Sequence, residues 1–181
     1  MTNFGNRYEI SSLTNDKVKL INSLHHRKYR REHNLFVAEG IRICREAIEN
    51  DWEIRYLLYD NLHADIQKIE NLISDVLCLG ADVIGVTSEI LSKISHKANS
   101  QNVLCVICQK WNDLPGIIKD KTFVALETVR DPGNLGTILR TMDGVGATDC
   151  ILLDECTDPF SYESVRASMG AIFNVNIIAS S

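Results

Sequence analysis

The 181-residue sequence lacks any hydrophobic run long enough to cross a membrane. No window approaches the roughly 18 consecutive apolar residues that a spanning helix needs. Its start, MTNFGNRYEI, has no basic stretch followed by an apolar segment, so we expect no signal peptide. It also lacks internal repeats and low-complexity tracts. With 45% hydrophobic and 24% charged residues, it has the composition of a globular protein, which we expect in the cytoplasm.

The sequence also lacks an excess of positive charge, because 19 basic residues against 24 acidic ones give a formal net charge of −5. Proteins bind nucleic-acid backbones mainly through Lys and Arg, so an RNA-binding role must depend on a local basic face. One basic cluster lies at 25–31, at the end of a helix that apolar spacing predicts over 14–30. Its cations are Arg27, Lys28, Arg30 and Arg31. They either complement the helix C-terminus or contact RNA phosphates, and the sequence alone leaves both roles open.

Cysteine motifs for metal or redox chemistry are nearly absent. Of six cysteines, only Cys105 and Cys108 have Cys-x-x-Cys spacing, and no second pair completes a zinc site. On a strand, this spacing points the two thiols to opposite faces, whereas a redox pair is expected at a helix N-terminus. We therefore expect two core positions, no metal site, and reduced thiols in the absence of a secretion signal.

The order of the expected elements is that of an α/β protein. Residues 1–109 alternate helix and strand patterns and are expected to form one domain. Residues 110–120 contain a proline and a glycine and are expected to be a linker. Residues 121–181 are expected as strand, helix, strand, helix, strand. A parallel sheet needs both faces covered, and about 60 residues is small for an independent core, so this second domain looks incomplete.

The most informative segment is 131–146, DPGNLGTILRTMDGVG, which follows an apolar stretch. Asn134 is expected near the N-cap of a helix, where its side chain accepts from orphan backbone N–H groups. Two nearby glycines let the backbone pass close to a ligand. Arg140, six residues after Asn134, would lie about 9 Å away along the helix axis and so border the same cleft.

A dinucleotide-binding unit is an alternative interpretation of this segment. Asp154, eighteen residues after Gly136, would then be the acid that binds a ribose. Gly133 and Gly136 give only Gly-x-x-Gly, however, and the full fingerprint is absent.

Three segments together resemble one protein family. DPGNLGTILRT at 131–141 is similar to the first motif of the SpoU/TrmH family, the RNA 2′-O-ribose methyltransferases of the knotted SPOUT class. The positions that meet the family pattern are Asn134, Gly136, Arg140 and Gly146. Downstream, 158–173 resembles the family stretch that ends Arg-Ala-Ser-x-Gly-Ala. Upstream, FVAEGIRICREAI at 36–48 resembles the start of the substrate-binding domain that precedes SPOUT domains.

The resemblance implies both a fold and a reaction. An N-terminal α/β RNA substrate-binding domain would precede a SPOUT methyltransferase domain. The enzyme would transfer methyl from S-adenosylmethionine to a ribose 2′-hydroxyl of ribosomal or transfer RNA, as a homodimer. Arg140 would act on the hydroxyl or its neighbouring phosphate. Because a free guanidinium has a pKa above ~12, we expect an electrostatic clamp rather than a base.

The resemblance also assigns roles to other residues. Asn134 would position Arg140 or the ribose, and the acidic Glu127 would orient Arg140 or brace Arg130. RNA contacts are expected from Arg27, Lys28, Arg30, Arg31 and Arg166. Within this chain, cofactor contacts are expected at most at Gly136 and Gly170.

Two further family motifs, which form the trefoil knot that holds S-adenosylmethionine, would follow Ser181. The resemblance thus implies an incomplete SPOUT domain, with most cofactor contacts beyond Ser181 and this chain inactive alone. A non-catalytic RNA-binding or dimerisation module is the alternative. A smaller departure lies at 99–102, where Asn-Ser-Gln-Asn stands at the family's Pro-Gln-Gly position.

Overall fold

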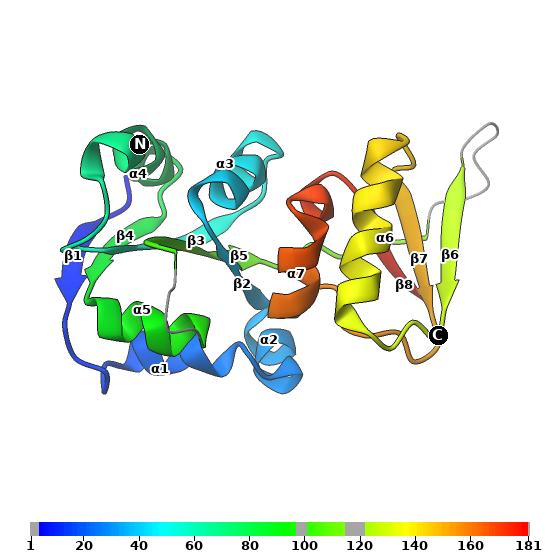
Figure 1. The fold of residues 1–181 in the computed structure, drawn as a ribbon, viewed down its shortest axis with the longest axis horizontal. Coiled ribbons are helices and arrows are strands. Elements are labelled where there is room, and N and C mark those ends of the chain that lie inside the picture. The colour runs from blue at the N-terminus through cyan, green and yellow to red at the C-terminus, as the bar shows by residue number, and fades with distance from the viewer. Residues whose placement is uncertain (1–3, 97–100, 115–121, 181) are drawn as a thin grey trace. The chain divides into compact units, whose positions relative to one another are not determined.

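The computed structural model describes residues 4–96, 101–114 and 122–180. It divides into two compact units, Met1–Cys108 and Gln109–Ser181, each of which has its own sheet (Figure 1). Helices and strands alternate in both, which confirms the predicted α/β class. Among the described residues, no helix combines the length and apolar character needed to cross a membrane.

The first unit builds one sheet from its strands and surrounds it with helices. The strands are β1 (Arg7–Ile10), β2 (Leu35–Glu39), β3 (Ile54–Asp60), β4 (Asp82–Val86) and β5 (Val103–Cys108). The helices are α1 (Asp16–Ser23), α2 (Arg27–His33), α3 (Ile41–Glu49), α4 (Ile66–Cys78) and α5 (Ser88–Ser95).

The strands of the first unit follow the order β1-β4-β3-β5-β2. β4 pairs in parallel with β1 and β3, whereas β5 runs antiparallel to β3 and β2. Helices α1 and α5 lie on one face of this sheet, and α3 and α4 lie on the other (Figure 1). Because helices cover both faces, the central strands are mostly apolar and every residue of β2 is buried.

The helix predicted over 14–30 is in fact two helices, so this prediction was right only in part. α1 ends at Ser23, α2 begins at Arg27, and His26 between them is extended, with φ −93° and ψ 129°. Nη1 of Arg30 donates to the carbonyl oxygens of Leu24 and His25, at 2.8 Å each. Carbonyls at a helix end lack intrahelical partners, so this side chain stabilises the break.

The second unit contains β6 (Phe123–Glu127), β7 (Asp149–Leu153) and β8 (Asn176–Ser180) in a parallel sheet of that order. Helices α6 (Pro132–Gly144) and α7 (Tyr162–Ser168) connect the strands, and a 3₁₀ turn at Ala171–Phe173 precedes β8. This confirms the order of elements predicted for 121–181. Right-handed crossovers place both helices on the same face of the sheet.

Burial alternates along β7, the central strand of the second unit. Cys150 and Leu152 are buried, whereas Ile151 and Leu153 are half-buried. No residue of β6 is fully buried, and Ala125 is exposed. Within the described residues, the sheet therefore has one closely packed face and one partly exposed face.

The predicted linker, 110–120, begins with residues that pack on the second unit. The Trp111 ring meets Phe160 edge to face, with 5.0 Å between centroids. Asn112 forms a parallel bridge with Ile178, and its backbone N–H donates to Ile177 at 2.9 Å. Residues 115–120 lie outside the described residues, so the linker stays a prediction.

Candidate functional site

The carboxyl ends of the parallel strands in the second unit lie level at one edge of the sheet. Glu127 at the end of β6 is in register with Leu153 of β7, which is in register with Ser180 of β8. The chain leaves β6 and β7 at this edge to enter α6 and α7 (Figure 1). Open parallel sheets bind ligands outside the carboxyl ends of their strands, so this edge is the candidate site.

The residues that follow β6 and β7 both have a left-handed backbone. Thr128 has φ 56° and Asp154 has φ 55°. For a β-branched residue such as Thr128 this conformation is an outlier, which costs about 1–3 kcal/mol and is common near functional sites. The N–H of Thr157 donates to the carbonyl of Val129 at 2.7 Å and so ties the two loops together. No sequence pattern indicates this role for Thr128, because threonine disfavours the conformation.

Asp131, not Asn134, is the N-cap of α6. The Asp131 side chain accepts from the backbone N–H of Asn134 at 2.7 Å, and Pro132 occupies the first turn. The predicted capping role of Asn134 is therefore wrong, because the helix begins earlier, at Pro132. Asn134 is instead exposed on the first turn of α6.

Asn134, Thr137 and Arg140 are exposed positions on successive turns of α6. The Thr137 hydroxyl donates back to the carbonyl of Gly133 at 2.8 Å and so is occupied within the helix. The side chain of Arg140 makes no hydrogen bond or ion pair with any residue that the structure describes. Its guanidinium is thus available to an external anion, as the predicted role requires.

Glu127 does not brace Arg130. Arg130 pairs instead with Glu155 of the following loop, at 3.6 Å, and both side chains are exposed. Glu127 is exposed at the carboxyl edge and forms no ion pair within the described residues. Its proposed action on Arg140 stays a prediction.

Gly136 lies at the contact between α6 and α7. A Cβ atom there would come within 2.5 Å of the Ser164 carbonyl oxygen and 2.8 Å of the Ser168 backbone nitrogen. The glycine therefore lets the two helices approach closely, and a cofactor contact by it stays a prediction. Gly133 and Gly136 both lie inside a helix rather than in a turn after a strand, which removes the basis of the dinucleotide-binding alternative.

The two other predicted site residues of this unit lie on or after α7, away from the carboxyl edge. Arg166 is exposed on the last turn of α7. Gly170 follows α7, has φ 103°, and precedes the amino end of β8. A cofactor at the carboxyl edge would therefore lie at the opposite end of α7 from Gly170.

The basic cluster of the first unit divides into surface and core. Arg27, Lys28 and Arg31 are exposed on α2, and the Lys28 ammonium lies 5.6 Å from the centroid of the Tyr29 ring. Arg30 is only 4% exposed and bonds the end of α1. The prediction that Arg30 contacts RNA is therefore wrong, because its guanidinium is used inside the fold.

The cysteine pair lies on β5, as predicted. Burial raises the pKa of the Cys105 thiol well above its usual value. Burial, together with a hydrogen bond involving Glu53, raises the pKa of Cys108 to about 11. Both thiols are thus protonated at neutral pH and poorly suited to redox or metal chemistry. In the described parts of the chain, no group of three or more His, Cys, Asp or Glu side chains could hold a metal ion.

Family models match both units. The model of the MRM3-like substrate binding domain matches residues 15–105, and the model of the SpoU rRNA methylase family matches residues 121–181. The chain belongs to the SpoU methylase family. The family that the three sequence segments resemble is thus confirmed.

Curated relatives and solved structures agree with this family. The 23S rRNA (guanosine(2553)-2′-O)-methyltransferase RlmP of Bacillus subtilis is 27% identical over 94% of this chain and 64% of its own length. A crystal structure of an rRNA methyltransferase from Sinorhizobium meliloti is 39% identical with a TM-score of 0.89, over 97% of this chain and 66% of that one.

An AdoMet-bound structure of an rRNA methyltransferase from Sinorhizobium meliloti is 38% identical, with a TM-score of 0.87. The match covers 96% of this chain and 64% of that one. This SpoU family chain thus spans slightly less than two thirds of the length of these three proteins.

Proposed function

We propose that the protein containing this chain transfers a methyl group from S-adenosylmethionine to a ribose 2′-hydroxyl of ribosomal RNA. The proposal depends above all on Asn134 and Arg140, two exposed residues of α6. They lie within a unit that matches the SpoU family, and no described residue pairs with the Arg140 side chain. The relatives named as rRNA 2′-O-methyltransferases support this substrate. Residues 1–109 would hold the RNA, and residues from 121 onward would belong to the methyltransferase domain.

The chemistry of the carboxyl edge suits the cofactor. S-adenosylmethionine carries a sulfonium and an ammonium, and both are cations. Glu127, Asp154 and Glu155 place carboxylates at or just after the strand ends of this edge. Carboxylates favour nearby cations, so these side chains would help to hold the cofactor. When bound, S-adenosylmethionine supplies an activated methyl group.

Arg140 would stabilise the charge that develops on the ribose oxygen. A guanidinium stays protonated at neutral pH, so it does not act as a simple base. It donates hydrogen bonds in a planar fork, which suits an alkoxide or a phosphate. Its exposure and its lack of partners among the described residues leave all of these donors available. Asn134, exposed on the first turn of α6, would orient the ribose.

The exposed cations of α2 would contact the RNA backbone. Arg27, Lys28 and Arg31 lie within one short helix, and Tyr29, 37% exposed, could stack on a base. Arg166 on α7 is a further candidate for a phosphate contact. Such local clusters compensate for the net charge of −5. By resemblance, the active form would be a homodimer.

The test is a methyl-transfer assay with purified protein, radiolabelled S-adenosylmethionine and unmodified 23S rRNA. We expect label in RNA, at a nucleotide whose 3′ phosphodiester resists alkaline hydrolysis, as a 2′-O-methyl group requires. Label on a base would contradict the proposal. RNA binding without label would support the non-catalytic module instead.

A further inference from the structure

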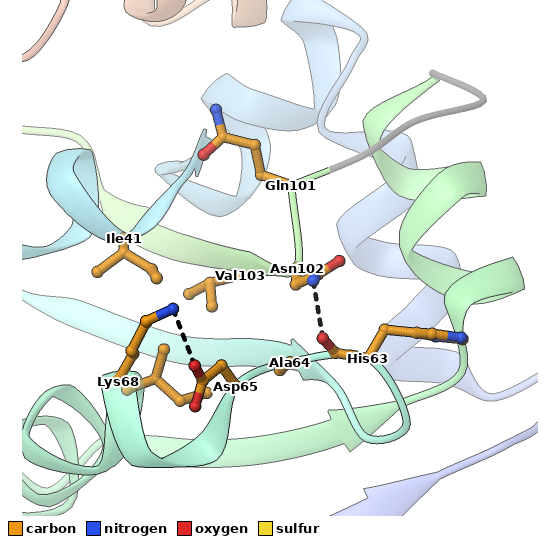
Figure 2. Close-up of a pocket in the computed structure, with 9 residues that line it drawn as sticks. Ile41, His63, Ala64, Asp65, Lys68, Gln101, Asn102 and Val103 are labelled. Atoms are coloured by element: carbon orange, nitrogen blue, oxygen red, sulfur yellow. Dashed lines mark hydrogen bonds and ion pairs between the residues drawn. The ribbon is translucent and has the colours of Figure 1, made fainter.

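A pocket of about 330 Å³ lies at one edge of the sheet in the first unit (Figure 2). β2 and β3 end at this edge and the antiparallel β5 begins there, since Glu39 pairs with Leu104 and Tyr59 pairs with Val103. The chain leaves β2 directly into α3, and it leaves β3 by a loop into α4. The pocket thus lies where three segments far apart in sequence meet.

The pocket combines apolar walls with a polar rim. Val103 and Ile69, each 1% exposed, form its inner surface together with Ile41. On the rim, the Lys68 ammonium lies 3.0 Å from the Asp65 carboxylate (Figure 2). A flat apolar ring with polar groups on its edge would match both parts of this lining.

Two amide side chains of the pocket have hydrogen-bonding groups that bond no described residue. Nδ2 of Asn102 donates to the carbonyl of His63 at 3.0 Å, and its Oδ1 accepts no hydrogen bond from the described residues (Figure 2). The backbone N–H of Gln101 donates to the Glu39 carboxylate at 2.6 Å, whereas its side-chain amide bonds no described residue. Such amides can read the donors and acceptors on the edge of a heterocycle.

Gly40 explains how Gln101 reaches its position. Gly40 has φ 110°, and a Cβ atom there would overlap Oε1 of Gln101. The bare glycine backbone therefore leaves the space in which the Gln101 side chain lies. Through this contact, the turn after β2 sets one side of the pocket.

Two arginines lie beside the pocket. A second hollow of about 420 Å³ shares Ile41 with it and is lined by Arg42, Arg45, Glu46 and Glu49. Arg42 and Arg45 are exposed on α3 and form no ion pair with any described residue. Guanidinium groups next to a pocket favour an anionic group on whatever enters it, above all a phosphate.

We propose that this pocket receives one unpaired nucleotide of the RNA substrate. Its base enters against Ile41 and Val103, the amides of Gln101 and Asn102 read the edge of the base, and the flanking phosphates meet the two arginines of α3. RNA recognition commonly uses bases that are splayed out of the helix in this way. The inference deepens the proposed function, because it depends on RNA being the substrate.

The test compares the affinity of the protein for two RNA hairpins that differ only in one bulged nucleotide. We expect the wild-type protein to bind the bulged hairpin about tenfold more tightly, which corresponds to about 1.4 kcal/mol of binding free energy. Ala64→Phe, which fills the pocket from its wall, should abolish this preference. Asn102→Leu, which removes an amide at similar volume, should reduce it.

The proposed phosphate contacts of the two arginines can be tested separately from recognition of the base. Arg42→Ala with Arg45→Ala should weaken binding to both hairpins and lower the salt slope of log Kd by about two. The matched control removes the exposed Lys19 and Lys93, which lie on α1 and α5 across the sheet. We expect this control to leave the salt slope of log Kd close to that of the wild-type protein.

Several outcomes would overturn the inference. One is an Ala64→Phe protein that melts like the wild type and keeps its preference for the bulge. Equal binding of both hairpins by the wild-type protein is another. Free mononucleotides that bind as tightly as the bulged hairpin would assign the pocket to a small nucleotide instead. All of these readouts are binding constants, so a failure of methyl transfer in the assay above would be seen separately.

Discussion

The buried charged side chains of the first unit differ in their partners from the exposed charged side chains on β6 and α6 of the second unit. In the first unit, Asp60 is 3% exposed and accepts from the Ser88 hydroxyl at 2.5 Å and from the backbone N–H groups of Leu62 and His63. Arg30 is likewise buried and bonded. In the second unit, Glu127 and Arg140 are exposed and have no partner among the described residues.

This contrast separates residues that hold the fold from residues that await a ligand. A buried charged group without its partners costs free energy, so substitutions of the partnered Asp60 and Arg30 should lower stability. An exposed side chain with no partner contributes little to folding, so substitutions there should change function alone. Substitutions in these two groups should therefore differ in whether they lower stability or activity.

Arg140→Ala should have the largest effect. Loss of one donor to a developing oxyanion costs about 10²–10³ in turnover, and we expect a loss of that size in methyl transfer. Because the Arg140 side chain bonds no described residue, the melting temperature should stay unchanged. Turnover numbers, cofactor affinity and a melting curve check this. Unchanged turnover in Arg140→Ala would show that Arg140 takes no part in the chemistry. The turnover of Arg140→Lys should lie between those of the wild type and Arg140→Ala, since lysine keeps the positive charge but lacks the planar fork of donors.

Arg30→Ala should destabilise the first unit by about 2–3 kcal/mol, because the carbonyls of Leu24 and His25 lose their charged donor. Arg31→Ala, one residue on and exposed, is the matched control and should change stability by less than about 0.5 kcal/mol. Urea unfolding measures both. If both variants lost the same stability, Arg30 would not be the structural residue of the pair.

Gly136→Ala should cost about 1–3 kcal/mol, since the added methyl group would overlap the α7 backbone. Gly144→Ala, on the same helix, adds a methyl group that would have no neighbouring atom within 4 Å. It should be neutral or stabilise by up to about 1 kcal/mol. Thermal melts of both variants decide the matter. If Gly136→Ala left the stability unchanged, close packing against α7 would not explain this glycine, and the ligand-binding role would be favoured.

Lowering the pH should destabilise the first unit through Asp82, and this is the smallest of the effects that we expect. Burial alone would raise the pKa of Asp82, but the N–H of Asn6 and the side chains of Lys17 and Tyr8 lower it below its ordinary value. The stabilisation is therefore complete above the unfolded pKa of about 3.9 and is lost as the pH falls through the lower folded pKa.

Asp82→Asn should thus be about 1 kcal/mol less stable than the wild type at neutral pH, with a difference that disappears in strong acid. Urea unfolding between neutral pH and strong acid measures this. The control is Asp51→Asn, because Asp51 is exposed and forms no ion pair with described residues. A constant difference at every pH would show that Asp82 acts through packing instead of charge.

The errors in the sequence-based predictions have local physical reasons. Asp131 and Asn134 are both good N-cap residues, and the helix start at Pro132 decides between them. The sequence of residues 27–31 does not indicate which cations are exposed and which are buried. In the structure, α2 directs the Arg30 side chain inward. Gly136 makes room for α7, which the sequence does not indicate, and a cofactor contact by this glycine stays a prediction.

The sequence by itself determined the α/β class, the order of elements in 121–181, the family, and the residues expected to carry chemistry. These features follow from local periodicity and short motifs, which neighbouring residues encode. Only the tertiary structure decided that Arg30 is internal and that Gln101 meets Glu39, 62 residues away in the chain. The contact of Gln101 with Glu39 depends on the strand order β3-β5-β2, which no local pattern specifies, so the pocket beside α3 could not be predicted from the sequence.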